Sequence, residues 1–239
     1  MTTLFISDLH LDAERPEIAA QLLTFLKGEA ASADALYILG DLFETWAGDD
    51  DPNPHFAMVK IALRKLVSRR VPVYIMHGNR DFAIGEQFAQ EAGVQILPDP
   101  YVAELYGENV LLSHGDAYCT DDVQYQALRK MTRDPAWLAM MLKKPLQERL
   151  AFAAKVRAAS AALGGTKEDI TDVNQGAIEQ ALRKANVDTM LHGHTHRPGI
   201  HRFTVDGEPA SRIVLGDWYE QGSIVRWDKN GPTLSVLPR

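Results

Sequence analysis

The chain has 239 residues, of which 46% are hydrophobic and 24% are charged, as in globular proteins large enough to bury a full core. Its formal net charge of −7 argues against a general nucleic-acid binder, which would carry a basic field. No uncharged apolar run approaches the ~18 residues of a membrane span, and the single cysteine, Cys119, excludes an intramolecular disulfide framework.

The chain enters a strand pattern directly, without a basic and apolar leader, so we expect a cytoplasmic protein. Charge is unevenly distributed along the sequence. Residues 120–170 contain nine Lys or Arg and six Asp or Glu, which makes this segment +3 and the remainder −10. The sequence therefore predicts an acidic body with a basic insert.

The first predicted strand, Thr3–Ser7, is followed at once by Asp8 and His10. Side chains of an extended backbone alternate, so this spacing would put the carboxylate and the imidazole on one side of the chain, within reach of one ion. The alternative is that Asp8 caps a turn and His10 is merely exposed.

A helix is predicted over residues 16–28, and the next strand, Ala35–Leu39, leads through Gly40 to Asp41. Taken alone, Asp41 could be an ordinary surface aspartate after a core strand. The loop that follows contains Asp49-Asp50-Asp51, which lacks the ligand spacing of a calcium loop. We expect a solvated loop with helix-capping aspartates there.

Three further predicted strands end in polar clusters. A helix near 55–69 precedes the strand 71–76, which runs into His77-Gly78-Asn79-Arg80-Asp81. The strand 110–113 runs into His114-Gly115-Asp116, and the strand 187–191 runs into His192-Gly193-His194-Thr195-His196. Asparagine offers a neutral oxygen ligand, histidine an imidazole, and arginine a fork that suits phosphate.

Residues 121–163 have a different pattern, with apolar residues at helical spacing, and predict a helical insertion or lid. Six large apolar side chains there either line a groove for hydrocarbon or pack the lid onto the body: Trp137, Leu138, Met140, Met141, Leu142 and Phe152. After residue 198, short strands with hairpin turns at 205–208 and 228–231 are expected.

Five strands, taken as successive, thus deliver seven candidate metal ligands: Asp8, His10, Asp41, Asn79, His114, His194 and His196. Oxygen and imidazole ligands without thiolate suit manganese, iron or zinc better than magnesium. Seven ligands are more than one ion uses, so two ions are implied, and Asp41 could bridge them with one oxygen facing each. Two adjacent ions lower the pKa of a bridging water toward neutrality and can clamp an in-line phosphoryl displacement.

These five motifs in this order resemble the signature of the calcineurin-like metallophosphoesterases. The resemblance implies an α/β (α+β) fold, a two-sheet β-sandwich flanked by helices, with a core of residues 1–119 and 171–239 and a helical lid at 120–170. It implies one metal at Asp8, His10, Asp41 and His196, and the other at Asp41, Asn79, His114 and His194. Two Mn²⁺ ions are expected there, with Mg²⁺, Fe²⁺ and Zn²⁺ as alternatives.

Most of that family has histidine after the asparagine, where this chain has Arg80. An alkoxide leaving group needs a proton, whereas a departing phosphate monoester, with a second pKa of ~6, does not. Arg80 therefore favours cleavage of a pyrophosphate bond, with the guanidinium neutralising the phosphate that leaves.

The similarity to one branch of the family runs nearly end to end. That branch hydrolyses UDP-2,3-diacylglucosamine in lipid A assembly, releasing UMP and 2,3-diacylglucosamine 1-phosphate after attack of the metal-activated water on the α-phosphorus. The resemblance implies catalytic roles for Asp41, Asn79, Arg80 and His114. It implies substrate contacts at Asn79, Arg80, Asp122, Tyr125, Arg157, Ser160, Lys167 and His194.

The basic lid would meet anionic head groups, so peripheral attachment to the cytoplasmic face of the inner membrane is expected. No nucleic acid and no protein partner is expected, and the chain is predicted to be a monomer. Two other functions share these ligands: a phosphodiesterase acting on a soluble nucleotide, and a non-catalytic scaffold on the same fold. His192 falls outside the implied metal shells, which favours a packing role.

Overall fold

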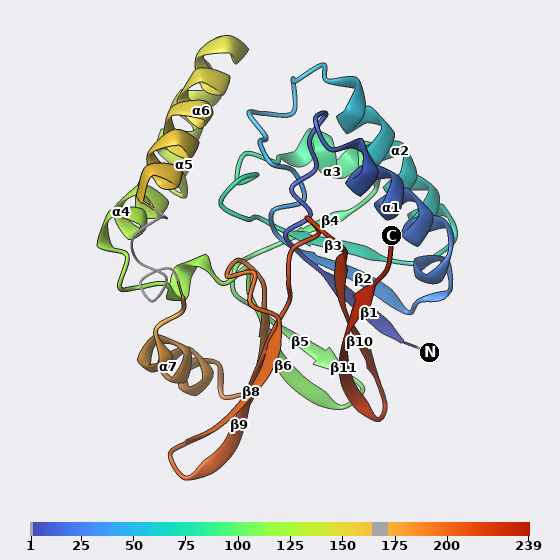
Figure 1. Cartoon of the computed structure of the whole chain (residues 1–239), viewed down its shortest axis with the longest axis vertical. Helices are drawn as coiled ribbons and strands as arrows, with labels where there is room; N and C mark the ends of the chain where they lie inside the picture. Colours follow the sequence, from blue (N-terminus) through green and yellow to red (C-terminus); the bar gives the residue numbers. More distant parts are fainter. Residues whose placement is uncertain (1, 164–171) are drawn as a thin grey trace.

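The computed structural model describes residues 2–163 and 172–239, and of residues 159–163 it describes the backbone alone. Two sheets lie face to face at the centre (Figure 1). The six-stranded sheet has the order β11 (Gly231–Leu237), β10 (Gly222–Asp228), β1 (Thr3–Ile6), β2 (Ala35–Leu39), β3 (Val73–Met76), β4 (Gln95–Leu97). The five-stranded sheet has the order β5 (Tyr101–Leu105), β6 (Glu108–Leu112), β7 (Thr189–His192), β9 (Glu208–Val214), β8 (Gly199–Val205).

Both sheets are mixed. Strands β1 to β4 are parallel to one another, β10 pairs antiparallel with β1, and β11 pairs antiparallel with β10. In the other sheet β6, β7 and β9 are parallel, and β5 and β8 form antiparallel edges. The parallel strands are apolar on both faces because both of their faces are covered.

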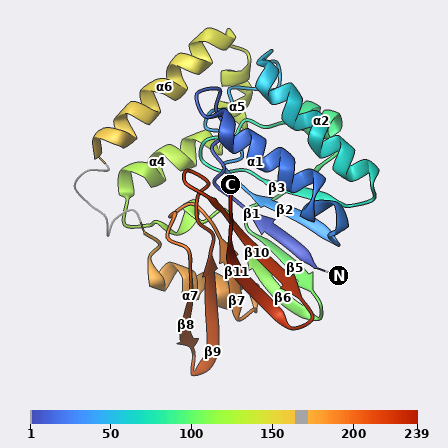
Figure 2. The ribbon, with the colours of Figure 1, turned by 45° about the vertical axis from the view of Figure 1, so that its right-hand side comes forward.

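Helices cover the outer faces of both sheets (Figures 1 and 2). Three lie on the six-stranded sheet: α1 (Pro16–Lys27), α2 (Pro54–Ser68) and α3 (Glu86–Ala92). One, α7 (Gln175–Ala185), lies on the five-stranded sheet. Two short 3-10 helices span Glu29–Ser32 and Asp116–Tyr118.

Alternation along single strands divides the core into layers. In β1, Leu4 and Ile6 pack with the helices α1 and α2, whereas Phe5 faces the second sheet. In β6, Leu112 faces the first sheet and Leu111 packs against α7. The two sheets are therefore joined by a continuous apolar layer, which fixes the positions of their strand ends relative to each other.

Three helices lie apart from the sheets, on one side of the strand ends (Figures 1 and 2): α4 (Val123–Thr132), α5 (Pro135–Leu142) and α6 (Leu146–Leu163). Asp122 caps α4 by accepting a hydrogen bond from the Tyr125 N–H, and Asp134 caps α5 by accepting from the Trp137 N–H. The predicted helical character of residues 121–163 is confirmed.

Most predicted elements are confirmed to within two residues at each end, and both hairpin turns lie where they were expected. The sequence patterns missed α3, β4, β5 and α7, so the five ligand-bearing strands are not successive. The strand β4 has three residues, too few for a periodic signal.

Candidate active site

Five strands point their carboxyl ends at one region between the sheets. Neighbouring parallel strands β1, β2 and β3 bring Asp8, Asp41 and Asn79 from the first sheet, and the parallel pair β6 and β7 brings the histidines from the second. Crevices at the carboxyl ends of parallel strands are where open α/β sheets bind ligands. All seven predicted ligands converge here, although the prediction took them from successive strands.

The first group surrounds Asp8. Its Oδ1 lies 3.4 Å from Nε2 of His196 and 3.9 Å from Nε2 of His10, and the two imidazole nitrogens are 3.2 Å apart. Nε2 of His10 also lies 3.8 Å from Oδ2 of Asp41. The carboxylates of Asp8 and Asp41 and the imidazoles of His10 and His196 thus face a common point.

The second group surrounds the amide oxygen of Asn79. Nε2 of His114 and Nδ1 of His194 each lie 2.9 Å from that oxygen. Nε2 of His114 also lies 3.7 Å from Oδ2 of Asp41. Asp41 is therefore common to both groups, as the resemblance implied.

The two oxygens of Asp41 have different surroundings. A single oxygen, Oδ2, faces both His10 and His114, while Oδ1 accepts a 2.8 Å hydrogen bond from the backbone N–H of Arg80. Because a carboxylate oxygen with one hydrogen bond keeps a second lone pair, the expectation that each oxygen faces one ion stays a prediction.

Five of the seven side chains stand on backbone in the left-handed region. The φ angles are 55° for Asp8, 50° for His10, 51° for Asp41, 66° for His194 and 55° for His196. The expectation that Asp8 and His10 share a side through extended backbone is therefore wrong, because β1 ends at Ile6 and the chain turns. Such conformations are costly for non-glycine residues and concentrate at functional sites.

Two glycines allow the ligand loops to approach each other. A Cβ on Gly78 would lie 2.0 Å from Oδ1 of Asp41, and one on Gly193 would lie 2.2 Å from Oδ2 of Asp8. Any larger residue would displace a carboxylate of the cluster. This explains why glycine precedes Asn79 and His194 in their motifs.

His114 has its other ring nitrogen hydrogen-bonded. Nδ1 of His114 is 2.9 Å from the carbonyl oxygen of Leu39, which can only accept, so this nitrogen carries the hydrogen. Nε2 of His114 faces the amide oxygen of Asn79, so it donates to that oxygen when protonated and can offer its lone pair to a cation when neutral. Oδ1 of Asp8, fully buried, has no hydrogen-bond partner. The residues present fit a divalent cation in each group.

Charge in the cluster is concentrated in a buried volume. Burial raises the pKa of Asp41 to about 6, and the nearby Asp81 and Asp8 add to the rise against opposing His114 and His10. Burial lowers the pKa of His114, but Asp41, Asp8 and Asp116 outweigh it and raise that pKa to about 9. Burial and the charge of His114 lower the pKa of His194 to about 3. These carboxylates favour bound positive charge, whether proton or metal.

Asp81 holds the Asp41 loop in shape. Its fully buried carboxylate accepts hydrogen bonds from the N–H groups of Leu42 and Gly78, both at 2.8 Å, and of Asp41 at 3.3 Å. The sequence placed Asp81 in the motif without a role. The one feature of the sequence that could have drawn attention to Asp81 is that this acid ends the polar cluster after β3.

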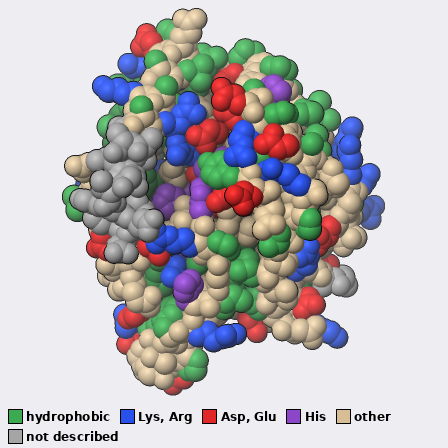
Figure 3. Space-filling view, viewed as in Figure 1, with side chains coloured by type: hydrophobic (Ala, Val, Ile, Leu, Met, Phe, Trp, Pro, Cys, Tyr) green, Lys and Arg blue, Asp and Glu red, His purple; other side chains and the backbone are tan. Residues whose placement is uncertain are grey.

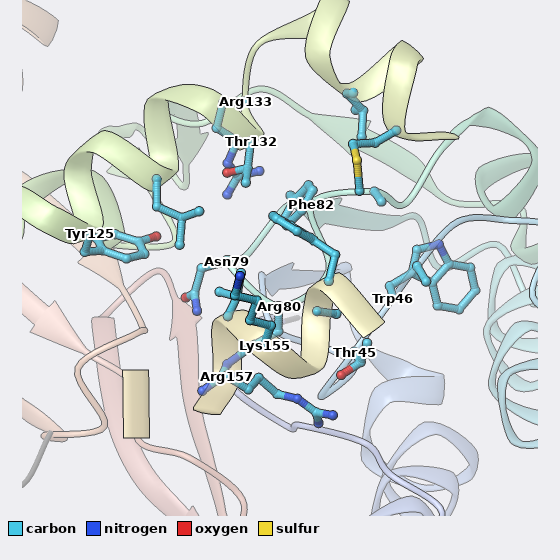
Figure 4. A pocket seen from close by; sticks show the side chains of 18 of the residues that line it. Thr45, Trp46, Asn79, Arg80, Phe82, Tyr125, Thr132, Arg133, Lys155 and Arg157 are labelled. Atoms are coloured by element: carbon cyan, nitrogen blue, oxygen red, sulfur yellow. The ribbon is translucent and has the colours of Figure 1, made fainter. Parts of the chain in front are cut away.

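A cavity of about 760 Å³ opens beside the second group and reaches under the lid (Figure 4). Asn79 and Arg80 lie on its inner wall, and Arg133, Lys155 and Arg157 extend into it from α6 and the end of α4. Figure 3 shows histidine side chains near the middle of this face, with basic and acidic side chains around them.

Of the predicted substrate contacts with described side chains, all except His194 line this cavity. Arg80, Asp122, Tyr125 and Arg157 line it directly. The ring of Tyr125 stacks on that of His194, with centroids 5.9 Å apart. Ser160 lies in α6, where only the backbone is described, and Lys167 lies outside the described residues.

Five of the six apolar lid residues line the cavity: Trp137, Leu138, Met141, Leu142 and Phe152. Leu138 also packs against the main core, so a residue can do both. Met140 is 52% exposed and is not among the lining residues, so its predicted place in a groove is wrong.

Hydrogen bonds and ion pairs at both ends attach these helices to the body. The buried carboxylate of Asp116 accepts hydrogen bonds from Tyr125 and from Nε of Arg129 at 3.0 Å, both on α4. At the other end, Arg149 of α6 donates to the carbonyl of Ala47 at 2.6 Å and pairs with Asp50. The cavity roof is thus fixed on both sides of the strand ends.

The acidic triplet behaves largely as predicted. Asp49 accepts hydrogen bonds from the N–H groups of Gly85 at 3.0 Å and Phe88 at 2.9 Å, so it caps α3 from a distant loop. His192 is buried, with Nδ1 2.8 Å from the carbonyl of Gly193 and Nε2 3.2 Å from Nη1 of Arg212. This agrees with a packing role.

The sequence did not predict two carboxylates that contact histidines of the first group. Oε2 of Glu44 lies 2.9 Å from Nδ1 of His10, and Oδ2 of Asp217 lies 3.3 Å from Nδ1 of His196. Neither follows a core strand in a recognisable motif, so no spacing pointed to them.

Comparisons with known proteins agree with this geometry. A family model described as calcineurin-like phosphoesterase matches residues 1–198. The sequence is 54% identical to a UDP-2,3-diacylglucosamine hydrolase of Stenotrophomonas maltophilia (strain R551-3) and 52% identical to one of Enterobacter sp. (strain 638), with 100% of both chains covered in each case. A solved structure of a novel archaeal phosphodiesterase is 14% identical and has a TM-score of 0.50, covering 99% of this chain and 100% of that one, which is a likeness of fold.

Proposed function

The chain belongs to the calcineurin-like phosphoesterase family, and from this premise we propose that it hydrolyses the pyrophosphate bond of UDP-2,3-diacylglucosamine in lipid A synthesis. The products would be UMP and 2,3-diacylglucosamine 1-phosphate. The observation that carries the proposal is that the ligand cluster opens at Asn79 into a cavity that is cationic near the cluster and apolar under the lid. A nucleotide diphosphate joined to two acyl chains has this sequence of chemical groups.

The roles of the chain's own residues follow from their positions. Asp8, His10, Asp41 and His196 would hold one divalent cation, and Asp41, Asn79, His114 and His194 the other. Such a pair supplies a nucleophile from water at neutral pH and neutralises phosphate oxygens. The buried carboxylate of Asp41 keeps both groups in register, since its Oδ2 faces His10 and His114 alike.

Arg80 has the position needed to stabilise the leaving group. It follows Asn79 directly and lines the cavity, so a phosphate bound at the cluster would lie within reach of its guanidinium. A phosphate monoester leaves without protonation, so a fixed positive charge suffices where an acid would otherwise be required. Asn79, Arg80, Asp122, Tyr125, Arg157, Ser160, Lys167 and His194 are proposed to contact the substrate.

We propose manganese as the metal. Mixed imidazole and oxygen ligands without thiolate suit Mn²⁺ better than Mg²⁺, and Fe²⁺ or Zn²⁺ would also fit. Activity of the metal-free protein after addition of Mn²⁺, Mg²⁺, Fe²⁺ or Zn²⁺ tests this choice. Highest turnover with Mg²⁺ would overturn it.

The proposed domains are a core of residues 1–119 and 171–239 and a lid of residues 120–170. Apolar lid residues would bind the acyl chains, where each buried methylene contributes about 0.8 kcal/mol. Met131, Leu142 and Leu150 are partly exposed on these helices together with Lys143 and Lys144. No helix among the described residues is long and apolar enough to cross a bilayer.

We therefore propose that a monomer binds the cytoplasmic face of the inner membrane through the lid surface, where each Lys or Arg near anionic lipid contributes about 1 kcal/mol. Sedimentation with anionic vesicles measures this binding, and Lys143→Glu with Lys144→Glu should weaken it. The matched control is Lys27→Glu with Lys65→Glu, on the helices that cover the other side. Equal vesicle binding of all three proteins would contradict the lid assignment.

The function itself is tested by incubating the purified protein with Mn²⁺ and detergent-solubilised UDP-2,3-diacylglucosamine and measuring UMP. A parallel assay uses a soluble dinucleoside polyphosphate and a cyclic nucleotide. Faster turnover of the lipid supports the proposal. Faster turnover of a soluble nucleotide would instead favour a phosphodiesterase, and a protein that binds metal but turns over none of these substrates would contradict both.

A further inference from the structure

The loop after β2 places Glu44 against the loop after β1. Beyond the ends of the two strands their backbones continue to pair: the N–H of Leu11 donates to the carbonyl of Leu42 at 3.0 Å, and the N–H of Glu44 donates to the carbonyl of Leu11 at 3.1 Å. An isolated parallel bridge joins Leu11 and Phe43. The distance between Glu44 and His10 is therefore set by backbone pairing rather than by a flexible side chain alone.

One oxygen of Glu44 faces the imidazole of His10, on the side of the ring away from the first ligand group. Oε2 approaches Nδ1 of His10 to 2.9 Å, and neither atom has another polar partner among the described residues. This carboxylate oxygen is therefore the polar group that the buried Nδ1 faces. His10 is almost fully buried, so water cannot replace this partner.

The other oxygen of Glu44 faces the cavity. Oε1 lies 3.6 Å from Nη1 of Arg80 and 3.5 Å from Nη1 of Arg157, which comes from α6 of the lid. Two guanidinium groups at these distances favour the ionised carboxylate. Glu44 is thus a charged residue between a metal-facing histidine and two basic side chains of the cavity.

We propose that Glu44 is a positioning residue for metal binding: its carboxylate holds His10 with Nδ1 toward Glu44 and the lone pair of Nε2 toward Asp8 and Asp41. A carboxylate behind a histidine ligand fixes the ring orientation and raises the basicity of the coordinating nitrogen. The proposal rests on the metal site proposed above, but it does not depend on which substrate is hydrolysed.

Asp217 stands in the same relation to His196, at 3.3 Å from Nδ1. In the second group, by contrast, Nδ1 of His114 has a neutral backbone carbonyl as its partner. Among the described side chains, carboxylates at Nδ1 are thus found for the two histidines around Asp8, and loss of Glu44 should affect that group alone.

The test uses Glu44→Gln, which keeps the size of the side chain and removes its charge. Manganese bound per chain is measured by equilibrium dialysis without substrate, across a range of free Mn²⁺. We expect one class of site to be weakened about 10- to 100-fold and the other to be unchanged. Glu104→Gln, on an exposed position of β5, removes the same charge far from the site and should bind manganese as the unaltered protein does.

A double-mutant cycle with His10→Ala tests whether Glu44 affects manganese binding through His10. In the His10→Ala background, Glu44→Gln should cause no further loss of manganese affinity, because the histidine through which it acts is gone. Additive losses would overturn the proposal. So would unchanged manganese affinity in Glu44→Gln together with an increased KM, which would mean that Glu44 acts through Arg80 and Arg157.

If Glu44→Gln does not fold, as judged by circular dichroism, Glu44→Asp provides the second measurement. The shorter side chain keeps the charge but withdraws it from Nδ1 of His10. Manganese affinity lower than that of the unaltered protein is expected, and higher manganese concentration should restore turnover. Glu44→Asp with unaltered manganese affinity would overturn the requirement for this contact.

Discussion

The backbone N–H of Arg80 donates a 2.8 Å hydrogen bond to Oδ1 of Asp41. The residue whose guanidinium lines the cavity therefore also fixes, through its main chain, the carboxylate that faces both ligand groups. These two contributions can be separated, because only the side chain changes on substitution.

Arg80→Ala should lower kcat about 10²- to 10³-fold, as expected when one donor to developing negative charge is lost. Thermal unfolding should change little, because the N–H that binds Asp41 is retained and the side chain is partly exposed. Steady-state kinetics and a melting curve measure the two effects. Arg80→Lys should recover part of the rate, and a destabilised Arg80→Ala protein with normal turnover per folded molecule would contradict the assignment.

Substitution of a single ligand should lower the number of bound metal ions by an amount that depends on the ligand. His10→Ala and His114→Ala each belong to one group, so each should retain one well-bound Mn²⁺ of two. Asp41→Ala should lose more metal than either, because Oδ2 of Asp41 faces both groups. Metal analysis after dialysis measures this. Asp41→Ala that keeps as much metal as His114→Ala would argue against a shared ligand.

Asp81→Ala should destabilise the fold by about 3 kcal/mol or more, because the buried N–H groups of Leu42, Gly78 and Asp41 would lose their acceptor. Urea unfolding of the metal-free protein measures the loss without a contribution from bound metal. Asp206→Asn, which breaks only an exposed pair with Arg183, is the control and should barely move the midpoint.

Cys119 should react slowly with alkylating reagents. Burial, together with Asp116, Asp172 and Asp122, raises the pKa of this thiol to about 12, so the reactive thiolate is scarce at pH 8. A pKa raised by folding leaves stability unaffected below the unfolded pKa and reduces it as pH rises toward 12.

Iodoacetamide labelling of Cys119 at pH 8 should be at least about 100-fold slower in the native protein than in urea, because burial hinders access and the thiolate is scarce. The native rate should still be increasing at pH 10. A native rate that levels off between pH 8 and 9 would mean that the thiol has an ordinary pKa.

Much of the site could be predicted from local patterns. Each ligand follows an apolar strand, and a buried strand with a polar end is legible in the sequence because burial demands apolar residues on both faces. The order of the five motifs was also sufficient to predict the fold class, which the family match confirms. The helical insertion could be predicted because its apolar residues recur at helical spacing.

The sequence by itself thus determined which residues could bind metal and on which kind of element they stand. Tertiary structure alone decided which groups surround each oxygen of Asp41, because the hydrogen bond to Oδ1 comes from a residue 39 positions away. It also decided that Asp8 and His10 converge through left-handed turns, and that Glu44 supports His10 across two paired loops. Such relationships depend on contacts between distant segments, and no local spacing records them. Asp41 was visible as an acid at a strand end, but only the folded chain shows that its Oδ2 faces both His10 and His114.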